Sequence, residues 1–496
     1  MGDLRFTVPP TQDFDPRVWE TAYISGIEGI PWYCHHSLDG QQFSIGREID
    51  ESGKLNIVWP TKSFGNLCLA TTSLRLSDQP YNLAVELARG TVSRLRNQTA
   101  EWQRAGLRLP DKFFPLAEDA LSRFLRAVTC GGDAAAQLSQ AQQAIELSVE
   151  ASVLLCSTFA AQSLEARRQT EGRLSTLLGV ELSPQLQDAT DAEGVSRAFN
   201  LLCVAPDFGR VETASSRAAY EPFDAQVEWA TGNAKKLCIG PLVNFRPGGL
   251  PQWMVMLNES YDNILSAACE YARATVERYR GQAHIWNAAA GLNIPSELNW
   301  SDEEVLRMAV ALIETVRRAD DRCPVLLTID QPWSEYLRDD PNGISPLHFA
   351  DALIRADLGL SGLALDLNMD TWPGGSFPRD PVEVNRLIDR WSMLGLPLMV
   401  ILSSPTEAGP IAAGPTEAAP RLPTQPVSSW PTRADRSGIM SPEHLVRLLL
   451  SKPSVHALIW SDGSREHRPQ RSLWNAALTA KPLLNNMAAL RKALLH

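Results

Sequence analysis

Two aspartates end apolar, strand-like runs late in the chain. Asp330 closes the run 326–330 (LLTID), and Asp366 closes the run 363–366 (LALD). Paired carboxyl groups can divide the work of bond hydrolysis, because one protonates the leaving oxygen while the other attacks or activates water. Asp330 and Asp366 are therefore the candidate catalytic residues. Two other roles compete with catalysis: capping of the following loops and binding of a ligand without reaction.

Amides, acids and aromatic rings stand at or after these and other strand ends. Amides and carboxylates hydrogen-bond hydroxyl groups, and tryptophan faces can stack on the apolar faces of sugar rings. Ordinary packing in turns is the competing explanation for each of them. The candidate substrate-binding residues are Asn244, Asn287, Gln331, Trp333, Glu335, Tyr336, Asn368, Trp372 and Trp460.

Other catalytic and metal-binding patterns are missing from the sequence. It contains no CxxC, no HExxH, no GxSxG and no glycine-rich phosphate loop after a strand, so zinc, serine-hydrolase and nucleotide chemistry lose support. Cys34 and the two histidines that follow it have no further ligand with metal-site spacing. We expect no cofactor and no metal, and we interpret the eight scattered cysteines as reduced thiols of a cytoplasmic protein.

The elements that must position Asp330 and Asp366 form an alternating pattern over 176–496. Apolar, β-branched runs alternate with helical segments, which predicts a (β/α)8 TIM barrel and leaves a doubly wound sheet as the competing α/β layout. The strand-like runs are 177–182, 199–204, 236–243, 283–287, 324–330, 362–368, 396–403 and 455–460. A Pro/Ala-rich loop at 405–438 interrupts the alternation, either as a tolerated insertion or as a lid or partner contact.

Two smaller parts precede the barrel. Short alternating runs in 1–80 predict an all-β sandwich of jelly-roll type, in which Trp32, Tyr33 and Trp59 either stack on sugars, as in a carbohydrate-binding module, or pack the core. Residues 81–175 have helical periodicity and predict a helical connector. The fold class is therefore multidomain: sandwich, connector and α/β barrel.

Several barrel segments resemble family 10 glycoside hydrolases, the xylanase-type barrels. The segment 279–291 (YRGQAHIWNAAAG) is similar to that family's RYKGKVxxWDVVNE, and 237–253 is similar to its GHTLVWHxxxPxW. The segments 199–206, 394–401 and 455–460 resemble its FNxVTPEN segment, its nucleophile strand and its last strand. The resemblance implies a (β/α)8 barrel and a retaining reaction that uses two glutamates.

This sequence departs from the family where the chemistry lies. Ala290 and Gly291 stand where the resemblance expects the Asn-Glu pair, and Leu402 or Ser403 stands at the nucleophile. Arg246 replaces the second histidine of the GHTLVWH-like segment. Loss of both carboxylates implies loss of the standard double-displacement route.

Charge and composition limit the classes of molecule that the protein is expected to bind. The chain has 46 basic and 57 acidic residues, a net charge of −11, and neither a signal sequence nor a membrane span is visible. An acidic surface disfavours nucleic acid and anionic membranes. We expect a cytoplasmic protein whose barrel binds an oligosaccharide or other glycan without standard activity. The alternatives are an active O-glycosyl hydrolase that uses Asp330 and Asp366, and a cytoplasmic interaction or scaffold protein.

Overall fold

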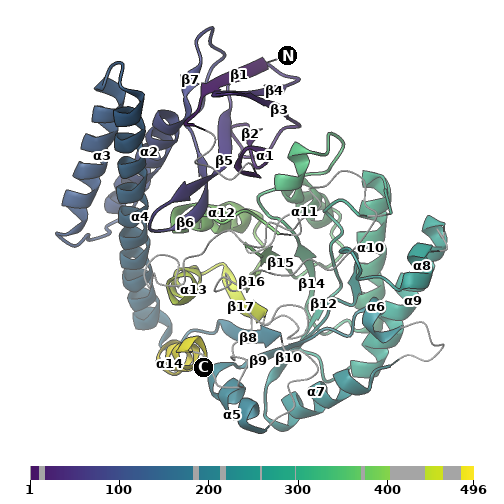
Figure 1. The fold of residues 1–496 in the computed structure, drawn as a ribbon. Helices are drawn as coiled ribbons and strands as arrows, with labels where there is room; N and C mark the ends of the chain where they lie inside the picture. Colours follow the sequence, from purple (N-terminus) through teal and green to yellow (C-terminus); the bar gives the residue numbers. More distant parts are fainter. Residues whose placement is uncertain are drawn as a thin grey trace.

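The chain folds into three parts that follow one another in sequence (Figure 1). The computed structural model describes residues 2–10, 17–181, 189–212, 219–256, 260–296, 298–369, 375–402, 442–461 and 482–495. The predicted loop at 405–438 lies outside these residues.

The first part consists of two small sheets with the strand orders β3-β4-β1-β7 and β2-β5-β6. Its elements are β1 (Gly2–Thr7), α1 (Arg17–Glu20), β2 (Tyr23–Ser25), β3 (His35–Asp39), β4 (Gln42–Arg47), β5 (Lys54–Thr61), β6 (Gly65–Ala70) and β7 (Tyr81–Asn82). The tight connection between β3 and β4 pairs Asp39 with Gln42 and places Gly40 at φ +57°, a conformation that favours glycine. The predicted sandwich is confirmed.

Three helices connect the sandwich to the barrel: α2 (Leu83–Arg104), α3 (Phe113–Thr129) and α4 (Ala134–Glu171). Leu87 of α2 and Ile145 of α4 share one core with the sandwich. The contact with β6 is so close that a Cβ on Gly90 would lie 2.0 Å from the carbonyl oxygen of Ala70. Trp59 is fully buried in this core, and its indole N–H donates to Gln142 of α4 at 2.9 Å. Sandwich and helices therefore form one packed unit.

The third part is a closed barrel in which neighbouring strands run parallel, with the order β10-β12-β14-β15-β16-β17-β8-β9. The barrel strands are β8 (Leu177–Glu181), β9 (Leu201–Val204), β10 (Lys236–Ile239), β12 (Ile285–Asn287), β14 (Val325–Ile329), β15 (Gly362–Leu367), β16 (Leu398–Leu402) and β17 (Val455–Ser461). They coincide with the eight predicted runs, and the TIM barrel is confirmed.

Helices surround the barrel (Figure 1), and a short two-stranded pair follows the carboxyl ends of β10 and β12. The pair is β11 (Val243–Asn244) with β13 (Ala289–Ala290). The helices are α5 (Ala189–Ala198), α6 (Phe208–Val211), α7 (Glu221–Gly232), α8 (Gln252–Met256), α9 (Tyr261–Tyr279), α10 (Asp302–Ala319), α11 (Pro346–Arg355), α12 (Pro381–Ser392), α13 (Pro442–Leu450) and α14 (Pro482–Leu494), with the 3-10 helix η2 (Glu335–Arg338).

The long helix α4 runs beside both the sandwich and the barrel (Figure 1). By length and composition it passes as a membrane-spanning helix, but half of its apolar stretch is buried. It packs against α2, α3, α12 and α13, and core helices of non-membrane proteins have the same properties. Packing inside the protein thus accounts for the buried half of its apolar stretch.

The barrel strands bury both faces, as parallel strands between helices do. Side chains of one face, such as Leu327, share a core with helix residues such as Val276 and Leu312. Side chains of the other face form a cluster of strand residues alone, including Leu326 and Ala364. Because successive side chains of a strand alternate between faces, this second cluster identifies the residues that point into the barrel.

Candidate functional site at the barrel mouth

The carboxyl ends of the eight strands bring polar side chains together above the apolar barrel interior. Because side chains alternate along a strand, Glu181 shares the inward face of β8 with Leu177, Asn287 shares that of β12 with Ile285, and Asp366 shares that of β15 with Ala364. On β17, Ser461 follows the inward-facing Ile459, and its hydroxyl donates to Glu181 at 3.0 Å. Active sites of TIM barrels lie at this end, so we take this mouth as the candidate site.

Arg246 occupies the centre of the mouth. Its Nε donates to Oδ1 of Asp330 at 2.5 Å, and its Nη2 donates to Oδ2 of Asp366 at 2.7 Å. The side chain of Asp330 is only 3% exposed, that of Asp366 16% and that of Arg246 31%. The structure therefore brings the two candidate catalytic carboxylates to one opening, and it places a guanidinium between them.

The backbone holds Arg246 in this position. The side-chain oxygen of Asn244, in β11, accepts from the amide N–H of Arg246 at 3.2 Å. Gly291 follows β13 with φ +79°, and a Cβ there would lie 2.4 Å from the backbone nitrogen of Arg246. Only a residue without a side chain fits this approach, so position 291 cannot carry a carboxylate in this backbone.

Asp330 is fixed from three directions. Its Oδ2 accepts from the amide N–H of Gly291 at 2.8 Å, while Arg246 holds the other oxygen. Asn293 brackets the backbone of Asp330, because its side chain donates to the carbonyl at 2.8 Å and accepts from the amide at 2.9 Å. Such a carboxylate is pre-oriented and still has lone pairs that can accept a hydroxyl.

Electrostatics favours a permanently charged Arg246. Burial lowers the pKa of Arg246, but Asp330, Asp366 and Glu181 together raise it above the ordinary value. Asp207, after β9, behaves differently, because burial raises its pKa to about 6 against the opposing effect of Arg210. The mouth thus combines fixed charges with one carboxyl that titrates near neutral pH.

A second arginine–carboxylate cluster lies beside the mouth, at the junction with the sandwich. Nη2 of Arg379 donates to Oε1 of Glu335 at 2.7 Å and to the hydroxyl of Tyr23 at 2.9 Å. Ser376 and Phe377 also donate to the Glu335 carboxylate, at 3.3 and 3.2 Å. The Arg379 and Glu335 side chains are 3% and 0% exposed, so this arginine is buried together with its carboxylate, whereas Arg246 at the mouth is 31% exposed.

The loop after β14 turns from the mouth toward that junction. Gln331 and Ser334 adopt positive φ values of +42° and +69°, which non-glycine residues rarely adopt. Trp333 lies under the Arg379 guanidinium at 4.8 Å from the ring centroid, and the hydroxyl of Tyr336 donates to the carbonyl of Ile344. Gln331, Trp333 and Tyr336 are all buried. The structure groups Trp333 with Glu335, apart from Asp330.

The remaining predicted residues lie in different places. Trp460 is buried on the outward face of β17, in the core between strands and helices. The carbonyl oxygen of Asn368 accepts from the amide of Ser376 at 2.7 Å. Trp372 lies outside the described residues.

Glu181, Asn293 and the ion-pairing role of Arg246 escape the reasoning from sequence. Glu181 is the last residue of the first barrel strand, Asp330 comes directly after β14, and Asp366 lies near the end of β15. The rule that functional residues stand at the carboxyl ends of barrel strands could therefore have found Glu181 as well. Asn293 lies in a loop with no pattern that marks it. In the sequence, Arg246 stands out only because it replaces a histidine of the family motif, and its ion pairs are not apparent.

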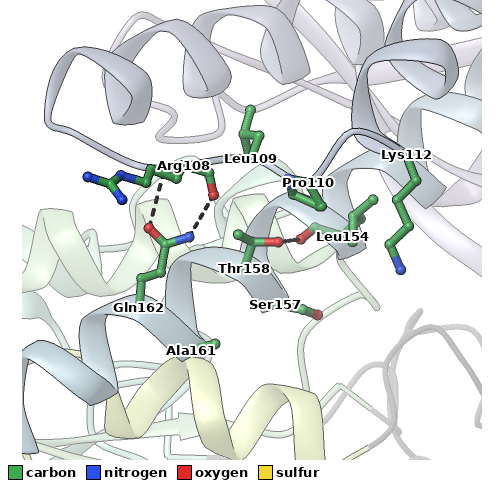
Figure 2. Close-up of a pocket in the computed structure, with 9 residues that line it drawn as sticks. All are labelled: Arg108, Leu109, Pro110, Lys112, Leu154, Ser157, Thr158, Ala161 and Gln162. Atoms are coloured by element: carbon green, nitrogen blue, oxygen red, sulfur yellow. Dashed lines mark hydrogen bonds between the residues drawn. The ribbon is translucent and has the colours of Figure 1, made fainter.

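A hollow of about 490 Å³ lies elsewhere, between the segment after α2 and α4. Figure 2 shows the side chain of Gln162 reaching the backbone of Arg108, whose N–H donates to it at 3.1 Å and whose carbonyl accepts from it at 2.6 Å. Both ends of that amide are occupied, and the lining has no acid, histidine or cysteine. In the described residues, no group of three or more His, Cys, Asp and Glu is arranged to hold a metal.

Comparison with known proteins concerns the barrel. No family model and no curated protein matches the chain. Similar solved structures include xylanase 10B from Thermotoga petrophila RKU-1 in complex with xylobiose, with 12% identity, a TM-score of 0.45 and coverage of 67% of this chain and 96% of that chain. Xylanase B from Clostridium stercorarium F9 has 15% identity, a TM-score of 0.46 and coverage of 66% and 98%.

A third similar structure is a psychrophilic family 10 endo-beta-1,4-xylanase, with 12% identity, a TM-score of 0.48 and coverage of 64% of this chain and 97% of that chain. The resemblance to xylanase-type barrels that the sequence predicts is confirmed as a likeness of fold. Identities this low do not transfer an activity.

Proposed function

We propose that the barrel mouth binds an oligosaccharide and that the protein does not perform the two-carboxylate retaining reaction. The observation that carries this proposal is the position of Arg246 between Asp330 and Asp366. Charged hydrogen-bond partners held in place before the ligand arrives favour recognition of hydroxyl groups.

The same contacts weigh against catalysis by these two aspartates. One oxygen of each carboxylate accepts from the Arg246 guanidinium, and the second oxygen of Asp330 accepts from Gly291. A general acid must deliver a proton to the leaving oxygen, and a nucleophile must face the anomeric carbon. The donors that hold both oxygens of Asp330 and one oxygen of Asp366 favour fixed acceptors over a proton donor or a nucleophile.

The position that the family resemblance assigns to the acid supports the proposal independently. Gly291 stands there, and its closeness to the backbone of Arg246 leaves no room for a Cβ. Leu402, at the nucleophile strand, is buried and apolar.

Calorimetry of the full chain against xylo- and cello-oligosaccharides tests binding. We expect wild-type binding at millimolar ligand or below, and at least about tenfold weaker binding for Arg246→Met, because the two carboxylates lose their common anchor. Arg278→Met is the matched control, since Arg278 pairs with Asp224 at 2.5 Å on the outer helices. Absence of wild-type binding at millimolar ligand would overturn the proposal.

Hydrolysis of aryl glycosides tests the enzymatic alternative. We expect the wild-type rate to equal that of the Asp330→Asn, Asp366→Asn double variant. A wild-type rate clearly above that of the double variant would assign catalysis to these aspartates.

The proposal also places the protein in the cytoplasm, with a short oligosaccharide as its ligand. All eight cysteines are free thiols in the structure, and Cys203 and Cys238 stay unbridged although they face each other on adjacent strands. Free thiols are typical of a reducing compartment.

A further inference from the structure

Glu181 is the carboxylate of the mouth that Arg246 leaves unpaired. It ends β8, is partly buried, and accepts a hydrogen bond from Ser461 at 3.0 Å. Within the described residues, no Lys, Arg or His nitrogen lies within 4.0 Å of its carboxylate. A partly buried carboxylate with a neutral partner alone favours the arrival of a cation.

The charges around Glu181 do not cancel. Arg246 is shared between Asp330 and Asp366, so these three groups together carry one negative charge. Asp207 is paired with Arg210 at 3.1 Å. Glu181 adds a second net negative charge, and the described part of the mouth is therefore anionic.

Asn287 provides an independent sign of a missing hydrogen-bond donor. It points into the barrel from β12 with 3% exposure, and its amide nitrogen donates to Thr328 at 2.7 Å. Its side-chain oxygen has no hydrogen-bond partner among the described residues. A buried acceptor without a donor is unfavourable, so a bound molecule that brings a donor relieves it.

The side-chain oxygens of Glu181 and Asn287 can each accept a further hydrogen bond, and the charge of Glu181 also favours a cationic partner. An ammonium group supplies three N–H donors with that charge, and hydroxyls supply further donors. We propose that the mouth prefers an amino sugar over a neutral sugar, with Glu181 as the counter-ion of its ammonium group. This preference rests on the proposed oligosaccharide binding.

Calorimetry of the full chain compares three tetrasaccharides: deacetylated glucosamine oligomer, its N-acetylated counterpart and cellotetraose, at a pH where the amine is protonated. We expect the deacetylated oligomer to bind at least about tenfold more tightly than the other two. In Glu181→Gln, which keeps the shape and the bond to Ser461, the affinity ratio should fall to within about twofold. Glu193→Gln, an exposed substitution on α5, is the matched control and should leave the ratio unchanged.

The outcomes separate this inference from the function on which it rests. Equal binding of all three sugars would overturn the preference and leave oligosaccharide binding intact. An unchanged ratio in a folded Glu181→Gln protein, checked by circular dichroism, would overturn the counter-ion role, and so would an equal loss of all three affinities. If none of the sugars binds, the proposed function itself fails.

Discussion

The barrel carries two arginine–carboxylate clusters at its mouth end, and they differ in what they leave open. At the junction, Arg379 and Glu335 are buried, Tyr23 accepts from Arg379, and Ser376 and Phe377 donate to Glu335. The difference is that the mouth keeps partly exposed charged groups, which the proposed binding requires, whereas the junction does not. The buried cluster of Arg379 and Glu335 connects the sandwich to the barrel.

The open cluster at the mouth has the opposite properties. Arg246 is 31% exposed, Asp366 is 16% exposed, and Glu181 stands nearby without an ion pair in the described residues. Exposure weakens the contribution of such a pair to stability, while burial makes removal of one partner costly. The comparison therefore predicts stability effects at the junction and ligand effects at the mouth.

The largest effect is expected from Glu335→Gln. It leaves the buried charge of Arg379 without its counter-ion, which typically costs about 3–5 kcal/mol of unfolding free energy. Urea unfolding followed by tryptophan fluorescence measures the loss, with Asp224→Asn at an exposed pair as control. A loss no larger than that of the control would remove the basis of the comparison.

Asp207→Asn should change how stability depends on pH. The folded-state pKa of Asp207 is about 6, above the value of about 3.9 for an unfolded chain, so the folded state binds more protons between these values. The contribution of Asp207 to the free energy of unfolding is present below about pH 4 and is lost as the pH rises through 6. The total loss is up to about 3 kcal/mol.

Asparagine retains the capping of α6 and removes this loss. The unfolding midpoint of Asp207→Asn, relative to wild type, should therefore be higher at pH 7 than at pH 4.5. Parallel pH profiles for the two proteins would contradict the assignment.

Tyr23→Phe tests the contribution of the sandwich to the junction. It deletes one hydrogen bond to Arg379 and leaves the ion pair with Glu335, so we expect a loss of about 1 kcal/mol. Thermal unfolding measures it, and Tyr33→Phe, at an exposed ring, is the control. A loss as large as that of Glu335→Gln would mean that Tyr23 contributes as much to the junction as Glu335 does.

Asp366→Asn should have the smallest effect on stability, below about 1 kcal/mol, because its pair with Arg246 is partly exposed. Its effect on oligosaccharide affinity should be larger than its effect on stability. A stability loss similar to that of Glu335→Gln would place the mouth cluster in the same structural class as the junction.

The sequence predicts the barrel well because its strands are apolar on both faces and the helices between them are periodic. It predicts Asp330 and Asp366 at one opening because strand ends meet at one edge. It groups Glu335 with them only through nearness in sequence. The positive φ values at Gln331 and Ser334 turn the loop away, and nothing in those residue types announces such a conformation.

Arg246 could not be predicted as the centre of the site, since its contacts come from strands far away in sequence. The docking of the helical connector on the barrel was equally hidden, because Arg94 of α2 and Asp380, which caps α12, pair at 2.5 Å across 286 positions of chain. Pairs of this kind depend on how whole elements assemble rather than on local pattern.

The tight approach of Gly291 to Arg246 also constrains how the barrel can evolve. A glutamate at position 291 would collide with the backbone of the neighbouring loop before its carboxylate reached the mouth. A glutamate there would require a simultaneous shift of the loop that carries Arg246. A single substitution at position 291 therefore cannot add a side chain while the loop that carries Arg246 keeps its present course.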